Sequence, residues 1–239
     1  MNHILPIFKK EFLGYFRSPV GYVILAVFHL MVIGLALYTG YYRNNQATLD
    51  SIFSTLPWIL IVFIPATGMR LWSEEKRSGS IELLFTLPIS PRTAVLAKYL
   101  AALCFICIGL ALTFSLAITT GYLGNPDWGV IFSGYIGGIL TASAFLAITS
   151  VCSAMTKNQV IAFVISVMIC LFATLAGSDW LARFLGDAIP VGMHDFLRLM
   201  SFEQHFQSMA KGLIDISALS FYITLTIACL GINIIAIER

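Results

Sequence analysis

The sequence predicts an all-α integral membrane protein with six transmembrane helices. Of its 239 residues, 59% are hydrophobic and 11% are charged, whereas a soluble globular domain has about 25% charged residues. About 20 mostly apolar residues are needed to cross the hydrocarbon core of a bilayer. Six segments qualify as spans, over residues 20–41, 55–71, 99–121, 128–152, 158–177 and 216–237.

The second predicted span is short and contains Pro57 and Pro65. Proline lacks a backbone donor and clashes with the preceding helical turn. We therefore expect a kink near Pro65, with neighbouring helices satisfying the carbonyl group that the proline leaves free.

The distribution of basic residues predicts that both termini lie in the cytoplasm. Cytoplasmic loops of membrane proteins are enriched in lysine and arginine. With the N-terminus inside, ten of the 14 basic residues fall on the inner side and the other four on the outer side. The inner ten are Lys9, Lys10, Arg17, Arg70, Lys76, Arg77, Arg92, Lys98, Lys157 and Arg239, and the outer four are Arg43, Arg183, Arg198 and Lys211.

Two segments outside the spans are too apolar for ordinary solvated loops. In residues 1–19, positions 5, 8, 12 and 16 place apolar side chains on one helical face, beside Lys9 and Lys10. This pattern predicts an amphipathic helix in the membrane interface, at an anionic inner leaflet. Residues 178–215 predict short outer helices that pack back against the bundle, with Pro190 and Gly192 marking the turn between them.

The inner segment 72–98 carries the most informative local pattern. A short helix is expected to begin after Gly79 and to end at Pro88. Acids near a helix start are favoured by the helix dipole, and apolar residues spaced by three and four share a face. The acids are Glu74, Glu75 and Glu82, and the apolar residues are Ile81, Leu84 and Phe85. The segment is interpreted as a docking platform for a soluble partner; a merely solvated loop is the alternative.

The same segment resembles that of a known family. Residues 75–84 read Glu-Lys-Arg-Ser-Gly-Ser-Ile-Glu-Leu-Leu and residues 87–90 read Leu-Pro-Ile-Ser. This is similar to the loop between the second and third spans of ABC-2-type transporter permeases. Residues 8–19 and 199–215 resemble the subgroup that includes the gliding-motility permeases and the permease associated with nitrous oxide reductase maturation. The resemblance covers essentially the whole chain in order.

This resemblance implies a single ABC-2-type transmembrane domain over residues 1–239. Its expected parts are an interfacial helix (1–19), spans 1 and 2 (20–71), a cytoplasmic coupling loop with a coupling helix (72–98), spans 3–5 (99–177), an outer segment of re-entrant helices (178–215) and span 6 (216–239).

The resemblance also implies the function and the partners of the chain. The expected function is that of the permease subunit of an ABC exporter in the bacterial inner membrane, coupled to ATP hydrolysis by a separate ATPase subunit. The expected partners are ABC ATPase subunits, a second permease copy or a related permease chain, membrane lipids and an outer-side accessory protein. Nucleic acid is not among them, because the sequence has no basic tract of the kind that binds it.

Ten residues of the inner segment are expected to couple the chain to the ATPase. Charged side chains would hold the docking register and contacts within the protein, Gly79 would provide the turn, and apolar side chains would contact the ATPase or the bundle. The ten residues are Glu74, Glu75, Arg77, Gly79, Ile81, Glu82, Leu83, Leu84, Phe85 and Pro88.

We expect no catalytic residue, cofactor or metal in this chain. The sequence has no Gly-x-x-x-x-Gly-Lys-Ser/Thr loop and no hydrolytic motif, so ATP and magnesium are assigned to the partner ATPase. The five cysteines lie in apolar segments without the spacing of a disulfide or metal framework.

Two further functions remain as alternatives. The chain could be a membrane anchor or scaffold that holds a cytoplasmic protein and moves nothing. An intramembrane enzyme is less favoured, because no paired intramembrane acids and no Ser/His/Asp set occur. The pattern is compatible with solute export and with mechanical work on an outer partner, and it does not specify a substrate.

Two features inside the spans predict helix packing. His29 lies in the middle of the first span, where we expect a neutral imidazole that is hydrogen-bonded to a neighbouring helix. Gly134, Gly138 and Ala142 form a face of small residues on the fourth span, which should let another helix approach closely.

Overall fold

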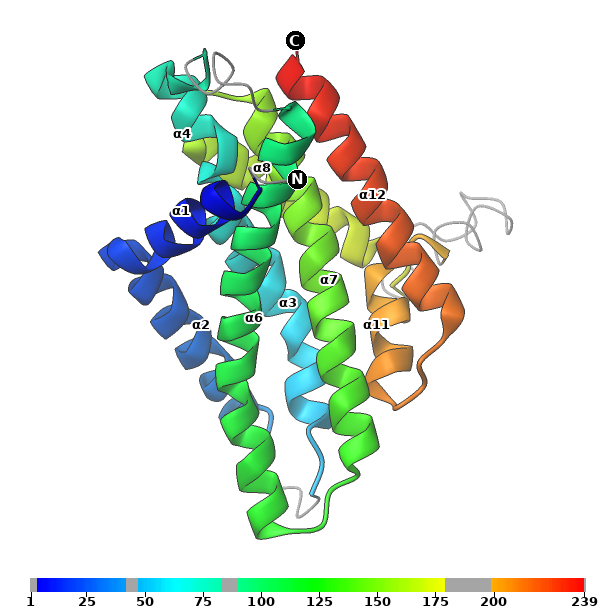
Figure 1. Ribbon diagram of the computed structural model, residues 1–239. Helices are drawn as coiled ribbons and strands as arrows, with labels where there is room; N and C mark the ends of the chain where they lie inside the picture. The colour runs from blue at the N-terminus through cyan, green and yellow to red at the C-terminus, as the bar shows by residue number, and fades with distance from the viewer. Residues whose placement is uncertain (1–3, 42–46, 83–89, 179–198, 239) are drawn as a thin grey trace.

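The computed structural model describes residues 4–41, 47–82, 90–178 and 199–238. Within these ranges all regular elements are helices, which confirms the all-α class (Figure 1). They are α1 (Ile4–Arg17), α2 (Pro19–Tyr38), α3 (Asp50–Gly68), α4 (Arg70–Ser78), α6 (Pro91–Leu123), α7 (Trp128–Met155), α8 (Gln159–Leu175), α11 (Phe202–Ala210) and α12 (Ile216–Glu238).

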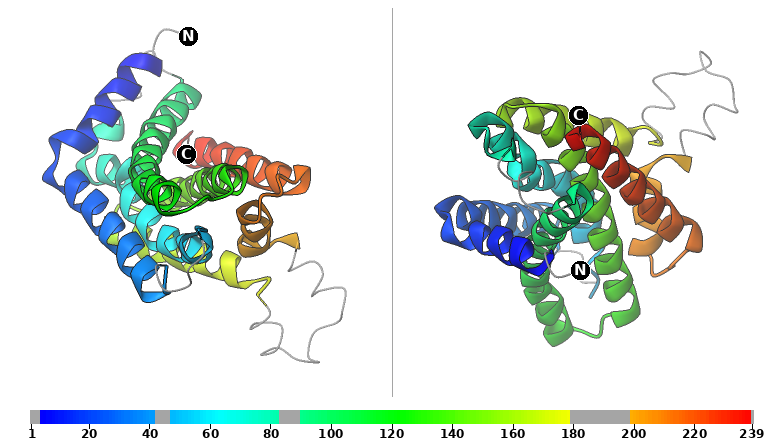
Figure 2. Two further views of the ribbon diagram at one scale, coloured as in Figure 1. Left: turned by 90° about the horizontal axis from the view of Figure 1, so that it is seen from below. Right: turned by 45° about the horizontal axis from the view of Figure 1, so that its top comes forward.

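Helix α7 is the centre of the bundle. It contacts α3, α4, α6, α8, α11 and α12, and much of its length is buried. Helices α1 and α2 meet at an angle at one edge of the molecule, where α1 packs across α6 (Figure 2). Elements that belong to distant parts of the sequence therefore meet around α7.

The ends of the helices fall into two groups at opposite ends of the bundle. The C-terminal ends of α4, α7 and α12 and the N-terminal end of α6 lie at one end, together with α1 (Figure 1). The start of α3 and the α6–α7 connection lie at the other end. The segments that carry most of the basic residues predicted on the inner side therefore lie at one end of the bundle. This agrees with the prediction that these segments share one side of the membrane.

Side-chain caps set where several helices begin. Ser90 accepts a hydrogen bond from the Thr93 amide and precedes Pro91, so α6 begins eight residues before the predicted span at residue 99. Asp127 and Asn158 cap α7 and α8 in the same way. The hydropathy pattern marked the apolar part of each helix, whereas the caps mark its beginning.

Five helical segments are long and apolar enough to cross a membrane, over Pro19–Tyr38, Asp50–Ser78, Pro91–Leu123, Trp128–Met155 and Ile216–Glu238. The predicted fifth span, residues 158–177, is the 17-residue helix α8. Seventeen residues rise about 26 Å, somewhat less than the hydrocarbon core of about 30 Å. Among the described helices, length therefore supports five spans and leaves α8 as the shorter candidate.

The predicted second span continues beyond its expected end at residue 71. Helix α3 contains Pro57 and Pro65 and stops at Gly68, and α4 resumes after a one-residue interruption at Met69. The Met69 amide still donates to the Pro65 carbonyl, at 2.9 Å. The interruption thus lies four residues after Pro65, near the place where a kink was expected.

The short helix expected after Gly79 was predicted to carry Glu74 and Glu75 near its start, and this part of the prediction is wrong. Both residues lie in α4, which precedes Gly79. The reason is that Leu71, Trp72 and Ser73 are buried where α4 packs against α7, so the helix continues until Gly79 breaks it.

The small-residue face on α7 is confirmed as a close packing surface. A Cβ atom added to Gly134 would lie 2.5 Å from the Phe53 ring of α3, and one added to Gly138 would lie 3.1 Å from Leu56. Ala142 is fully buried. Small side chains on α7 therefore set how closely α3 approaches.

Helix α11 confirms one of the short helices expected before the last span. Its Phe202, Phe206 and Met209 side chains are buried, and the Ser133 hydroxyl of α7 donates to the Met209 carbonyl at 2.7 Å. The expected turn at Pro190 and Gly192 lies outside the described residues.

The close approach of α3 to α7 predicts a specific sensitivity at Gly134. The substitution Gly134→Ala should lower the free energy of unfolding by about 1–3 kcal/mol, because the added methyl group overlaps the Phe53 ring. Gly231→Ala in α12 is the matched control, since its added Cβ would meet nothing within 4 Å. Thermal unfolding of the full chain in detergent measures both; equal melting temperatures would contradict the packing described.

Candidate functional site

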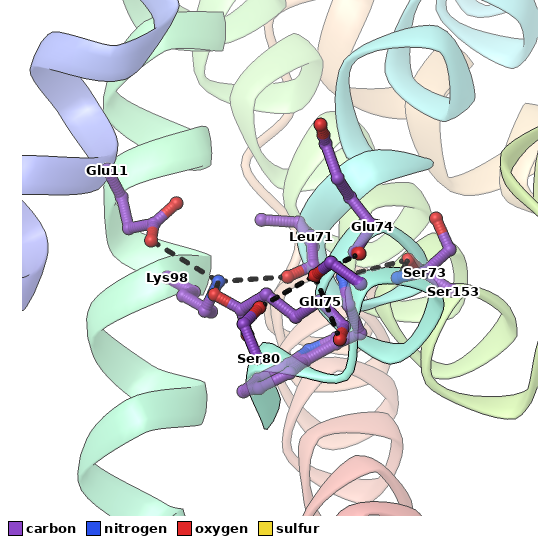
Figure 3. Close-up of polar contacts among 10 residues, drawn as sticks. Glu11, Leu71, Ser73, Glu74, Glu75, Ser80, Lys98 and Ser153 are labelled. Atoms are coloured by element: carbon purple, nitrogen blue, oxygen red, sulfur yellow. Dashed lines mark hydrogen bonds and ion pairs between the residues drawn. The ribbon is translucent and has the colours of Figure 1, made fainter. Parts of the chain in front are cut away.

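A buried lysine joins three helices at the end of the bundle where α4 stops. Lys98, on α6, is 3% exposed. Its ammonium group donates to the Glu75 carboxylate at 2.7 Å and to the Leu71 carbonyl at 3.0 Å, both on α4. It also pairs with the Glu11 carboxylate of α1 at 3.3 Å (Figure 3). We call these four residues the lysine network.

The lysine network satisfies a charge that burial would otherwise make costly. An ammonium group has three donors, and the three oxygen atoms of the network match that number. The Trp72 ring adds a cation–π contact, with Nζ 4.9 Å from the ring centroid. The second Glu75 oxygen, Oε2, is buried without a hydrogen-bond partner among the described residues. The position of α4 relative to α1 and α6 is therefore tied to the position of one cation.

A serine of α7 holds the beginning of α4. The Ser153 hydroxyl accepts from the Trp72 and Ser73 amides, at 3.0 and 3.1 Å, and donates to the Met69 carbonyl at 2.8 Å. The first amides of a helix have no partner within that helix, and Ser153 supplies one from another helix. Lys76 also donates to the Ala154 carbonyl. Helix α4 is thus attached to α7 as well as to α6.

Gly79 ends α4 in a left-handed conformation, with φ of 72°. This conformation favours glycine, because a Cβ atom strains it. Residues 80–82 are helical again, and the Glu82 amide donates to the Gly79 carbonyl at 3.3 Å. The predicted turn at Gly79 and the beginning of a new helical turn after it are confirmed.

The structure divides the predicted site residues into three groups. Glu74, Arg77, Gly79 and Glu82 are exposed, whereas Glu75 is bound inside the lysine network and Ile81 packs against the core. Leu83, Leu84, Phe85 and Pro88 lie outside the described residues. The charged residues were expected to hold the docking register and contacts within the protein, and Glu75 makes a contact of the second kind.

Sequence reasoning missed Lys98, Glu11 and Ser153 as parts of the site. Lys98 was counted only as an inner basic residue, although a charge next to the apolar segment 99–121 needs a partner. Glu11 lies three residues after Phe8 and four before Tyr15, which places an acid on the partly buried face of α1. An acid on that face was the available signal. Ser153 gave none, because a serine in an apolar span has many possible roles.

His29, the ionisable residue inside the first predicted span, bonds within its own helix. His29 Nδ1 shares a hydrogen bond with the Leu25 carbonyl of its own helix, at 3.1 Å, so the prediction that this atom bonds to a neighbouring helix is wrong. His29 Nε2 has no hydrogen-bond partner among the described atoms. No group of three or more metal-ligating side chains occurs within the described ranges.

The fold defines the class of protein as a multi-pass α-helical membrane protein. A family model described as "ABC-2 family transporter protein" matches residues 5–237, and the chain belongs to this family. It is therefore a membrane permease component of an ABC exporter. Members of this family are transmembrane components that work with an ABC ATPase subunit. A search of curated proteins gives no match.

The lysine network predicts how the isolated chain responds to loss of the cation. Lys98→Met should lower the free energy of unfolding by about 2–3 kcal/mol, because Glu75 is then left largely buried without its partner. Thermal unfolding of the full chain in detergent is the measurement.

Two further variants test this electrostatic effect. Lys157→Met removes an exposed lysine and should change the melting temperature little. Adding Glu75→Gln to Lys98→Met should recover part of the loss, because the unpaired charge is removed. A double variant no more stable than Lys98→Met would contradict an electrostatic origin of the loss.

Proposed function

We propose that this permease receives force from a separate ATPase subunit through the segment that begins at Gly79. The observation that carries the proposal is the continuity of α3 and α4, which extends a membrane-crossing helix to the exposed turn at Gly79. Exposed Glu74, Arg77 and Glu82 lie around that turn. In this proposal ATP and magnesium are bound by the ATPase, and residues 83–88 complete the contact.

The attachments of α4 support transmission into the bundle. A push on the Gly79 turn moves α4, whose Glu75 and Leu71 are bound to α6 through Lys98. Ser153 joins the same helix to α7. ATP-driven closure of the partner dimer would thereby tilt α3 and α6 together and open a path between two permease copies, or perform mechanical work. The proposal also includes membership of this chain in the subgroup of the family that residues 199–215 resemble.

The proposed topology places both termini in the cytoplasm of a bacterial cell, with α1 in the inner interface of the plasma membrane. The clustering of the ends of α4, α7 and α12 supports it (Figure 1), as does the excess of basic residues assigned to that side. Helix α8 is included as the fifth of six spans. Its deficit of a few ångströms can be met by local thinning of the bilayer.

The turn at Gly79 predicts a matched pair of variants. Gly79→Val should reduce permease-dependent ATP hydrolysis by about tenfold, because a β-branched residue in this conformation costs roughly 1–3 kcal/mol and shifts the following turn. Gly79→Asn should keep most of the activity, since asparagine tolerates a positive φ. Hydrolysis is measured in proteoliposomes that contain the permease and its ATPase.

Co-purification separates the transporter from the alternative of a passive anchor. Glu82→Ala should reduce recovery of the ATPase with the tagged permease, while Lys211→Ala, in the α11–α12 connection, should not. If Gly79→Val and Glu82→Ala both leave co-purification and ATP hydrolysis intact, the coupling assignment fails. If ATPase binding is retained in the native complex but the permease never alters hydrolysis, the anchor is favoured.

The proposed topology predicts opposite labelling of two introduced cysteines. In a background with the five native cysteines replaced by alanine, Arg77→Cys should react with a membrane-impermeant maleimide only after the cells are opened. Lys211→Cys should react in intact cells. The reverse pattern would place the Gly79 turn outside and remove the basis for ATPase coupling.

A further inference from the structure

A second polar region lies beside the lysine network, in a cleft between α1, α2 and the junction of α3 with α4. The cleft has a volume of about 200 Å³. Its charged lining residues are Glu11, Arg70 and Glu74. It shares Glu11 with the lysine network, but Arg70 and Glu74 take no part in that network.

The cleft contains one cation and one anion that are not paired with each other. Arg70 is half-buried and makes no ion pair with any residue that the structure describes. The Glu74 carboxylate is likewise without an ion-pair partner there, and its side chain points away from Lys98 (Figure 3). Because Glu11 is already bound to Lys98, Arg70 and Glu74 are the two charges free to meet a ligand of both signs.

A hydrogen-bonded contact between α1 and α3 lines the cleft. The Tyr15 hydroxyl donates to the Thr67 carbonyl at 3.3 Å, and Tyr15 also stacks on Phe105 of α6. Burial raises the pKa of Tyr15, and the nearby Glu11 carboxylate raises it further. Tyr15 therefore remains a neutral donor at physiological pH and adds no charge to the cleft.

Apolar side chains of α1 and α2 surround the cleft. Val20 and Ile24 of α2 contribute to its wall, while Tyr22 and Val23 next to them on the same helix are exposed. Leu5 of the amphipathic helix α1 is exposed as well. With α1 in the membrane interface, the cleft lies at the depth of lipid headgroups.

We propose that this cleft binds the headgroup of a zwitterionic phospholipid with a primary ammonium group. The Arg70 guanidinium matches a phosphate group, to which it can donate two parallel hydrogen bonds, and the Glu74 carboxylate accepts from the ammonium group. The cleft is smaller than the roughly 300–1,000 Å³ of sites that enclose drug-sized ligands. It takes the headgroup, and the acyl chains lie along the exposed side chains of α2.

Native mass spectrometry of the full chain, released from nanodiscs with equal amounts of phosphatidylethanolamine, phosphatidylglycerol and phosphatidylcholine, tests this proposal. One phosphatidylethanolamine should be retained preferentially. Arg70→Gln should lower retention of phosphatidylethanolamine and phosphatidylglycerol by about tenfold, because the phosphate loses a charge-assisted pair. Glu74→Gln should lower retention of phosphatidylethanolamine alone.

Matched variants separate the cleft from general lipid contact. Gly14 lines the cleft, and a Cβ atom added there meets nothing within 4 Å, so Gly14→Leu should fill the cleft without disturbing the fold and abolish retention. Gly34→Leu, at an equally open position on α2, should leave retention unchanged, as should Arg77→Gln on the exposed face of α4.

Three results would overturn the proposal. One is equal retention of phosphatidylethanolamine and phosphatidylglycerol with neither changed by Glu74→Gln, which would indicate simple attraction of phosphate groups. Another is full retention of phosphatidylethanolamine by Gly14→Leu. The last is displacement of the lipid by equimolar free phosphoethanolamine, which would indicate a soluble ligand. The proposal rests on the membrane placement of α1, and because no ATPase is present in the test, it can fail or hold independently of ATPase coupling.

Discussion

The ammonium group of Lys98 has to be satisfied by protein atoms, because the side chain is almost completely buried. Its acceptors come from α1 and α4, while the lysine itself is on α6. Three elements from separate parts of the chain are thus brought to one point. A displacement of any one of them lengthens a charge-assisted contact, so small independent movements are resisted and a joint movement is favoured.

The same logic explains why the break between α3 and α4 is tolerated. In a membrane, backbone groups freed by an interruption need partners within the protein. The Ser153 hydroxyl accepts from two amides and donates to one carbonyl at this interruption. A helix that is interrupted but fully hydrogen-bonded can act as a joint that stays attached to α7. We infer that force applied at the Gly79 turn reaches the bundle through this joint.

The class of fold and most spans were predictable, because an apolar run of about 20 residues with few charges has the length and composition of a membrane-crossing helix. The Gly79 turn was also predictable from the glycine between a charged segment and the following helical pattern. The positions of Glu74 and Glu75 were not, since burial of Trp72 against α7 is a long-range contact that extends α4. Lys98 was missed for the same reason: its partners are 23 and 87 positions away in the chain.

Glu11 gives the two regions at this end of the molecule a common element. It pairs with Lys98 in the lysine network and also lines the cleft assigned to a lipid headgroup. Leu71 is shared in the same way, since its carbonyl accepts from Lys98 and the residue also lines the cleft. A headgroup held by Arg70 and Glu74 would therefore favour the arrangement of α1 and α4 in which Lys98 is fully paired. By linkage, the free energy by which the bound headgroup favours this arrangement equals the headgroup-binding free energy that is lost when α4 moves out of it. Lipid composition would then set how readily the proposed joint moves.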